Sequence, residues 1–234
     1  MNETMTQEEL AIEDQPGVLP VLQSRQETKA FYNKIAHVYD LLSERSEQPM
    51  RAVGLDMLDV QPGERVLEIG FGTGHTLVEL AKAAGPGGRI DGLDVADKMV
   101  GVARQLLTKK ELADRVQLTC GDAEKMPYAA NTLDGVIMIF TLELFDTPDI
   151  LRVLDECKRV LRPGGRIVVV SISKEGDQGL LVRAFEWTHR HFPNLMDCRP
   201  IFVRRALVSA GFQIEDARVD HMWVPVEIVL ASKP

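Results

Sequence analysis

The stretch Val66-Leu67-Glu68-Ile69-Gly70-Phe71-Gly72-Thr73-Gly74-His75 decides the fold of this chain of 234 residues. It begins as a short apolar run, passes through a turn rich in glycine, and continues into residues with helical periodicity. Gly70 and Gly72 permit a sharp turn in which the backbone approaches a ligand, because no Cβ stands in the way. In an open parallel sheet, ligands bind at the carboxyl ends of strands. We therefore expect a ligand site at this turn.

Short apolar runs alternate with longer helical stretches from this turn onward. The runs occupy residues 65–69, 89–93, 116–120, 133–140 and 166–173. Strands that are apolar on both faces and alternate with helices are typical of a parallel sheet covered by helices on both sides. Two last runs, 212–219 and 226–231, are joined by too few residues for a parallel crossover, so they should pair antiparallel. The pattern predicts an α/β fold.

The N-terminal part differs from this alternating pattern. Residues 1–22 are polar and acidic, and we expect them to form a flexible tail before a single domain at 23–234. Within the region 23–60 the periodicity predicts two helices, at 26–42 and at 49–60, with proline as a preset first residue of the second. Further helices are predicted at 180–192 and 200–210.

Composition narrows the class of protein. The formal net charge is -8, and nucleic-acid binding usually needs a basic surface, so we expect no nucleic-acid partner. Cys120, Cys157 and Cys198 are far apart and form no CxxC pair, so neither a disulfide framework nor a metal site is expected. No run of eighteen apolar residues and no secretory signal are present, so we expect a cytoplasmic protein without a transmembrane segment, as a monomer or homodimer.

Acidic residues follow three of the predicted strands. Asp94 closes the second strand about twenty residues after the glycine turn, where a carboxylate can accept hydrogen bonds from ribose hydroxyls. Asp122, in Gly121-Asp122-Ala123, closes the third strand, and Glu143 follows the fourth in Phe140-Thr141-Leu142-Glu143. The structural alternative is capping of the following helix, a common role for Asp at a strand end.

Taken together, these segments resemble the class I S-adenosylmethionine (SAM)-dependent methyltransferases. Residues 68–74 look like the glycine motif of that family, Asp94 with Lys98-Met99 resembles its second motif, and residues 121–123 resemble its third. Residues 31–40 are similar to the N-terminal helix of the ubiquinone/menaquinone-biosynthesis type. The resemblance implies a Rossmann-like, mostly parallel sheet of seven strands in the order 3-2-1-4-5-7-6 with an antiparallel last strand and helices on both faces.

Carried over position by position, the resemblance implies a binding set for SAM and its product S-adenosylhomocysteine (SAH). The glycines would line the methionine part, with Glu68 near its amino group, and Asp94 would hold the ribose. Asp122 would bind the adenine edge, and Thr141 would lie beneath the sulfonium. The implied cofactor-binding residues are Tyr32, Tyr39, Glu68, Gly70, Gly72, Gly74, Asp94, Val95, Met99, Asp122, Ala123 and Thr141.

Residues for the chemical step are harder to choose. Methyl transfer from a sulfonium is an in-line displacement, so a general base is needed only for a protonated, weakly acidic acceptor. Candidate bases are Glu143 and His189, ahead of His75 and His191. His189 lies in segment 174–200, where this fold commonly inserts a substrate lid. The acceptor is expected to be a small molecule or lipid: a quinone precursor, amine, hydroxyl or thiol.

The sequence departs from the family pattern in places. Ala96 replaces a serine of many relatives, so a helix cap is lost and Asp97 is a candidate substitute. Glu143 stands in a region where several relatives carry histidine. Arg199 could bind an anionic group of a substrate, or it could cap or pair structurally.

Two other function classes compete with methyl transfer. A nicotinamide-dependent oxidoreductase needs Gly-x-Gly-x-x-Gly, but here Gly74 comes one residue early, and the antiparallel strand pair at the end also disfavours it. A regulatory protein that binds SAM or a nucleotide without catalysis stays open, because no indispensable base is identifiable. A nucleic-acid or amide methyltransferase commonly ends the fourth strand in Asn/Asp-Pro-Pro-Tyr, which residues 140–143 lack.

Overall fold

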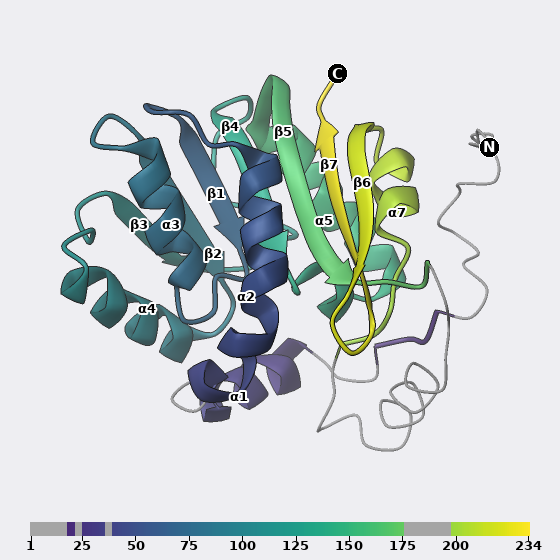
Figure 1. Cartoon of the computed structure of the whole chain (residues 1–234), viewed down its shortest axis with the longest axis horizontal. Helices are drawn as coiled ribbons and strands as arrows, with labels where there is room; N and C mark the ends of the chain where they lie inside the picture. The colour runs from purple at the N-terminus through teal and green to yellow at the C-terminus, as the bar shows by residue number, and fades with distance from the viewer. Residues whose placement is uncertain (1–17, 22–24, 36–38, 176–197) are drawn as a thin grey trace.

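The computed structural model describes residues 18–21, 25–35, 39–175 and 198–234 (Figure 1). Most of the predicted tail and of the 174–200 segment therefore lies outside the described residues, as does the helix predicted at 180–192. Residues 18–21 depart from a flexible tail, because Val18 packs against the hydrophobic core. The backbone N–H of Val21 also donates to Asp146 Oδ1 at 3.4 Å.

The sheet has seven strands and confirms the predicted order. Across the sheet the strands are β3 (Val116–Cys120), β2 (Arg89–Asp94), β1 (Arg65–Ile69), β4 (Leu133–Ile139), β5 (Leu161–Ile172), β7 (Pro225–Ser232) and β6 (Gln213–His221). β1 to β5 pair in parallel, and β7 is antiparallel to both β5 and β6. The reversal of strand order beside β1 places the carboxyl ends of β1, β2 and β4 next to one another.

Helices cover both faces of the sheet, as expected (Figure 1). Their bounds are α1 (Arg25–Ile35), α2 (Tyr39–Leu58), α3 (His75–Ala84), α4 (Asp97–Lys109), the short 3-10 helix η3 (Leu142–Leu144), α5 (Thr147–Val160) and α7 (Val203–Ser209). Figure 1 shows α2 in front of the strands and α5 behind them. Side chains of α2, α3 and α4 share one core cluster, and those of α5 and α7 share the other.

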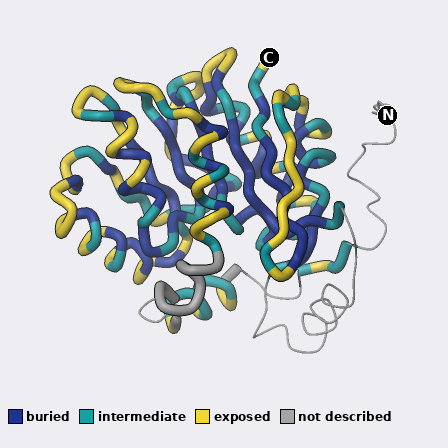
Figure 2. The backbone as a smooth tube through the Cα atoms, in the orientation of Figure 1, coloured by how far each residue is buried: buried dark blue, intermediate teal, exposed yellow. Residues whose placement is uncertain are grey.

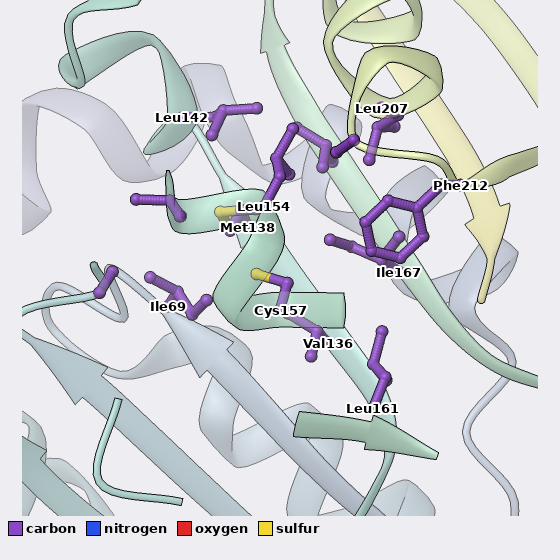
Figure 3. Packing of buried hydrophobic residues seen from close by; sticks show 14 of the residues in the cluster. Ile69, Val136, Met138, Leu142, Leu154, Cys157, Leu161, Ile167, Leu207 and Phe212 are labelled. Carbon is purple, nitrogen blue, oxygen red and sulfur yellow. The ribbon is translucent and has the colours of Figure 1, made fainter. Parts of the chain in front are cut away.

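Alternation along the strands produces these two core layers. In β5, Ile167 and Val169 face the layer of α5 and α7, whereas Val168 and Val170 face the layer of α2, α3 and α4. The most buried backbone in Figure 2 follows the strands, and exposed residues lie on the outer sides of the helices and on the edge strand β6. Figure 3 shows Cys157 of α5 packed among these apolar side chains, fully buried. Each such buried side chain contributes roughly 1.5–3 kcal/mol.

The predicted N-terminal helices are wrong in their boundaries. α1 ends at Ile35 and α2 runs from Tyr39 to Leu58, so Pro49 lies inside α2 instead of at its start. A proline inside a helix removes one backbone hydrogen bond, which the sequence rule treats as a boundary. Burial of Met50 and Leu58 against the sheet favours one continuous helix over two short ones.

Helix α4 begins with an unusual cap. Ala96 occupies the N-cap position and provides no side-chain hydrogen bond. Instead, Asn33 of α1 accepts the backbone N–H of Lys98 through its Oδ1 at 3.0 Å and donates its Nδ2 to Asp97 Oδ1 at 3.0 Å. Lys29, also on α1, pairs with Asp97 Oδ1 at 3.0 Å. The expected substitute cap, Asp97, therefore acts indirectly, and α1 supplies the cap that the local sequence lacks.

Two features are absent from the described residues. No helix among them has the length and apolar character needed to cross a bilayer. No group of three or more His, Cys, Asp or Glu side chains in the same ranges is arranged to hold a metal ion.

Candidate functional site

Three glycines after β1 shape the turn, each for a different reason. Gly70, Gly72 and Gly74 have φ angles of 72°, 51° and 91°, a region that L side chains rarely adopt. A Cβ on Gly70 would stand 2.3 Å from Thr141 Oγ1 at the end of β4, and one on Gly74 would stand 2.9 Å from the Cβ of Ala103 in α4. Around Gly72 a Cβ would meet nothing within 4 Å, so its backbone faces open space.

Asp94 at the end of β2 braces this turn. Its Oδ2 accepts the backbone N–H of Gly72 at 3.0 Å, and its Oδ1 accepts that of Ala96 at 2.8 Å. Burial raises the pKa of Asp94 to about 6, although these backbone donors favour the carboxylate. The backbone N–H of Val95 is a third donor to this carboxylate. A carboxylate has about four acceptor positions, so one remains for a ribose hydroxyl. Asp94 therefore faces the turn as predicted, whereas the cap of α4 comes from Asn33.

A cavity of about 430 Å³ lies over the ends of these strands. Its size falls within the range of small-molecule sites, and its lining is formed by α1, α2, the glycine turn, the ends of β2, β3 and β4, and the start of α5. The predicted cofactor-binding residues that line it are Tyr32, Glu68, Gly70, Gly72, Asp94, Val95, Met99, Asp122, Ala123 and Thr141. Gly74 packs against α4 instead, and the side chain of Tyr39 lies outside the described part of the structure.

Glu68 places an acidic group in the wall of this cavity. Its side chain is 2% exposed, and burial raises its pKa to about 8, opposed by a hydrogen bond with Thr76 and by the charge of Arg51. Its Oε2 finds no hydrogen-bond partner among the described residues. A buried acceptor without a donor is costly, so this oxygen suits a cationic donor from a ligand.

The β2 and β3 ends provide an apolar slot and a polar edge. Val95 is 37% exposed and Met99 is 1% exposed, and both line the cavity. Opposite them, Ala123 is 6% exposed, and Asp122 Oδ1 accepts the backbone N–H of Glu124 at 2.9 Å. Asp122 therefore stabilises its own turn while lining the cavity, and it caps no helix because β3 is followed by turns and then by β4. A flat aromatic base would cover the exposed apolar surface of Val95.

Residues that sequence reasoning missed complete the lining. Phe140, after β4, has a φ angle of 50°, a strained value for an aromatic residue, and it lines the cavity beside Thr141. Thr28 of α1 and Glu47 and Arg51 of α2 also line it. No sequence pattern distinguishes such helix residues from ordinary surface positions, because the helices reach the site only through the tertiary fold.

Of the two predicted catalytic residues, Glu143 is among the described residues, and it does not line the cavity. Glu143 is fully buried behind the lining, with its Oε1 3.5 Å from the backbone N–H of Ile172, and burial raises its pKa to about 8. His189 and His191 lie outside the described residues. His75 lines the cavity at the start of α3. Arg199 is buried outside the cavity lining, which favours its structural role over direct contact with a substrate.

Comparison with known proteins agrees with this geometry. A family model described as a methyltransferase domain matches residues 66–165, which hold the glycine turn, Asp94, Asp122 and the β4 end. The chain carries a SAM-dependent methyltransferase domain. The unpartnered Glu68 oxygen and the partly exposed Val95 of this methyltransferase domain both belong to residues that line the cavity at the carboxyl ends of the strands.

Two curated relatives and one solved structure illustrate the likeness of this methyltransferase domain. The demethylmenaquinone methyltransferase of Bacillus mycoides is 33% identical over 147 residues, covering 61% of each chain. The ubiquinone/menaquinone biosynthesis C-methyltransferase UbiE of Ectopseudomonas mendocina is 34% identical over 173 residues, 72% of this chain and 66% of the relative. A SAM-dependent methyltransferase from Aquifex aeolicus shares the fold, with a TM-score of 0.61, 22% identity and coverage of 88% of this chain and 98% of that one. The chain thus spans about 61% of the length of the first curated relative.

Proposed function

We propose that this protein transfers a methyl group from SAM to a small-molecule or lipid-type acceptor, with a quinol as the first candidate. The observation that carries the proposal is the juxtaposition of the open glycine turn, the braced Asp94 and the unpartnered Glu68 oxygen in one cavity. The names of the curated relatives support a quinone-type acceptor.

The binding roles follow from the chemistry of the lining. Glu68 would pair with the ammonium of the methionine part, and the open backbone at Gly72 would lie against that part. Asp94 would accept ribose hydroxyls, and Val95 and Met99 would pack on the adenine. Asp122 would meet the adenine edge. When bound, SAM supplies a methyl group on a sulfonium that is a good leaving group.

The chain itself contributes mainly the positioning of the reactants and the exclusion of water. Thr141 and Phe140 would lie beneath the sulfonium, and the apolar Val21, Leu144 and Phe145 line the remaining side of the cavity, where an acceptor would lie. Alignment of the acceptor atom with the methyl group supplies on the order of 7–11 kcal/mol. Exclusion of water favours a transition state in which the sulfonium charge disperses.

The participation of a general base in methyl transfer is part of this proposal. Carbon methylation of a quinol requires loss of a proton, and a base adds about 10²–10⁴-fold. Glu143 and His189 remain the candidates, but Glu143 is fully buried and does not line the cavity. His75 is a further candidate base, and it lines the cavity.

Calorimetry with SAH and with NAD tests the cofactor assignment. We expect SAH to bind and NAD not to bind; the reverse result would overturn the proposal. Asp94→Ala should weaken SAH binding by about 1.5–3 kcal/mol, the scale of hydrogen bonds to a charged group. The control Asp216→Ala removes an exposed carboxylate that pairs with Arg218 on β6, and SAH affinity should be unchanged.

Transfer of labelled methyl from SAM tests the acceptor. We expect incorporation into reduced naphthoquinones in preference to phospholipid amines and small thiols. Binding of SAH without transfer to any member of this panel would favour the regulatory alternative. Size-exclusion chromatography with light scattering would test the proposed monomer or homodimer.

A further inference from the structure

Arg199 is a fully buried arginine next to the candidate site. Its side chain is 0% exposed, and it is the largest of the fully buried side chains among the described residues. The neighbouring Ile201 anchors this stretch to the sheet, since its backbone N–H donates to Ile172 O at 3.0 Å. Arginine is almost never fully buried unless it is paired, and its guanidinium stays protonated in proteins. Such a placement requires a specific task.

The Arg199 guanidinium contacts a turn of the cavity wall from outside the cavity. Its Nη2 donates to the backbone oxygen of Phe145 at 2.7 Å and to Thr147 Oγ1 at 3.3 Å, and it lies 3.9 Å from Asp146 Oδ1. These three consecutive residues join η3 to α5, and Phe145 and Asp146 line the cavity. A charged donor gives a hydrogen bond about twice as strong as a neutral one.

Asp146 extends this connection to the N-terminal segment. Its Oδ1 accepts the backbone N–H of Val21 at 3.4 Å, and Val21 also lines the cavity. Arg199 therefore ties three distant stretches of the chain together, at 18–21, 145–147 and 198–201. The cofactor residues on the β1, β2 and β3 ends, such as Asp94, make none of these contacts.

We propose that Arg199 is a positioning residue for the methyl acceptor, which fixes the Phe145–Asp146 wall without contacting the cofactor half of the cavity. The inference rests on the proposed function, because it assigns this wall to the acceptor. Loosening the wall should misplace the acceptor and leave SAH binding intact. Misplacement by about 1 Å is enough to lower a rate about 10²-fold.

The test compares Arg199→Met, Arg199→Lys and the control Arg166→Met. Arg166 makes a similar arginine tie, to the backbone oxygens of Leu58 and Asp59 and to Glu64, before the start of β1 and away from the cavity. Three quantities are measured: SAH affinity by calorimetry, kcat and KM for reduced 1,4-naphthoquinone, and amide hydrogen exchange across residues 142–150.

For Arg199→Met we expect unchanged SAH affinity, a fall in kcat/KM for the naphthoquinol of about 10²-fold, and faster exchange at Leu144 and Phe145. Arg199→Lys keeps the charge, so its fall in kcat/KM and its increase in exchange should both be smaller than those of Arg199→Met. Arg166→Met should lower stability without these effects.

If Arg199→Met lost both SAH affinity and methyl transfer, the inference would be overturned. The same acceptor defect in Arg166→Met would also overturn it. If the unaltered protein transfers no methyl group, the proposed function fails by itself. In that case the hydrogen-exchange measurement still tests whether Arg199 stabilises the Phe145–Asp146 wall. Unchanged exchange at Leu144 and Phe145 in both Arg199 variants would show that it does not.

Discussion

Replacement of Glu68 by glutamine should make the cofactor-free protein more stable and its cofactor binding weaker. Burial raises the pKa of this carboxyl group from an ordinary 4.5 to about 8. Such a difference corresponds to about 5 kcal/mol, at 1.36 kcal/mol per pH unit. The residue thus lowers the stability of the empty protein progressively above about pH 4.5, and an ammonium ligand would offset that cost.

The sign of the pH dependence follows from proton binding. Above pH 4.5 the unfolded chain releases the Glu68 proton, whereas the folded chain keeps it up to about pH 8. The free energy of unfolding therefore falls across this window as the pH rises. Glu68→Gln removes this term, so the stability difference between variant and parent should grow by several kcal/mol from about pH 5 to about pH 9. A buried amide adds a cost that does not depend on pH, so the slope is the informative quantity.

Urea denaturation at several pH values measures the slope, and calorimetry with SAH measures the affinity. We expect SAH binding to weaken by about 1.5–3 kcal/mol, at least about tenfold. The matched control is Glu79→Gln on the exposed face of α3, where the carboxylate pairs only with Lys82 among the described residues, and both quantities should stay close to those of the parent. A difference that does not vary with pH, or an unchanged SAH affinity, would refute the reasoning.

Three further substitutions test other parts of the site. Gly70→Ala places a Cβ at a φ angle of 72° and 2.3 Å from Thr141 Oγ1, so urea denaturation should show a loss of at least about 1–2 kcal/mol, and unchanged stability would contradict the tight approach. Asn33→Ala removes the acceptor for the Lys98 N–H and should cost about 1 kcal/mol in the same assay, and unchanged stability would show that this hydrogen bond does not cap α4. Glu143→Gln should lower kcat for methyl transfer less than tenfold, because its carboxyl group lies outside the cavity lining; a loss of about 10²–10⁴-fold would instead identify a general base.

Most of the sheet could be predicted from local pattern. Strands β1 and β3 begin and end where the apolar runs do, at Arg65–Ile69 and Val116–Cys120. The order of the strands came from the family resemblance, and right-handed crossovers alone leave several orders open. Pro49 shows the limit of a local rule, since α2 continues through it when burial of its neighbours outweighs one lost hydrogen bond.

The candidate site could be predicted where its residues directly follow a strand. Asp94, Asp122 and the glycine turn meet in the cavity because the carboxyl ends of parallel strands meet. Arg51 and Phe140 could not be predicted, because one depends on how α2 crosses the sheet and the other on a backbone angle that its residue type disfavours. The sequence predicted correctly that Glu143 lies in the loop after β4. Within a 3-10 helix, however, a difference of one position decides which side chain faces the cavity.

The cap that Asn33 gives to α4 has a consequence for ligand binding. Asn33 lies on α1, which also carries Thr28 and Tyr32 of the cavity lining, so undocking of α1 would remove part of the lining and leave the Lys98 amide without its acceptor. By thermodynamic reciprocity, a ligand that binds more tightly when α1 is docked must favour the docked position of α1 by the same free energy. Asn33 and Lys29, which do not line the cavity, would then contribute to the affinity for that ligand through their contacts with α4.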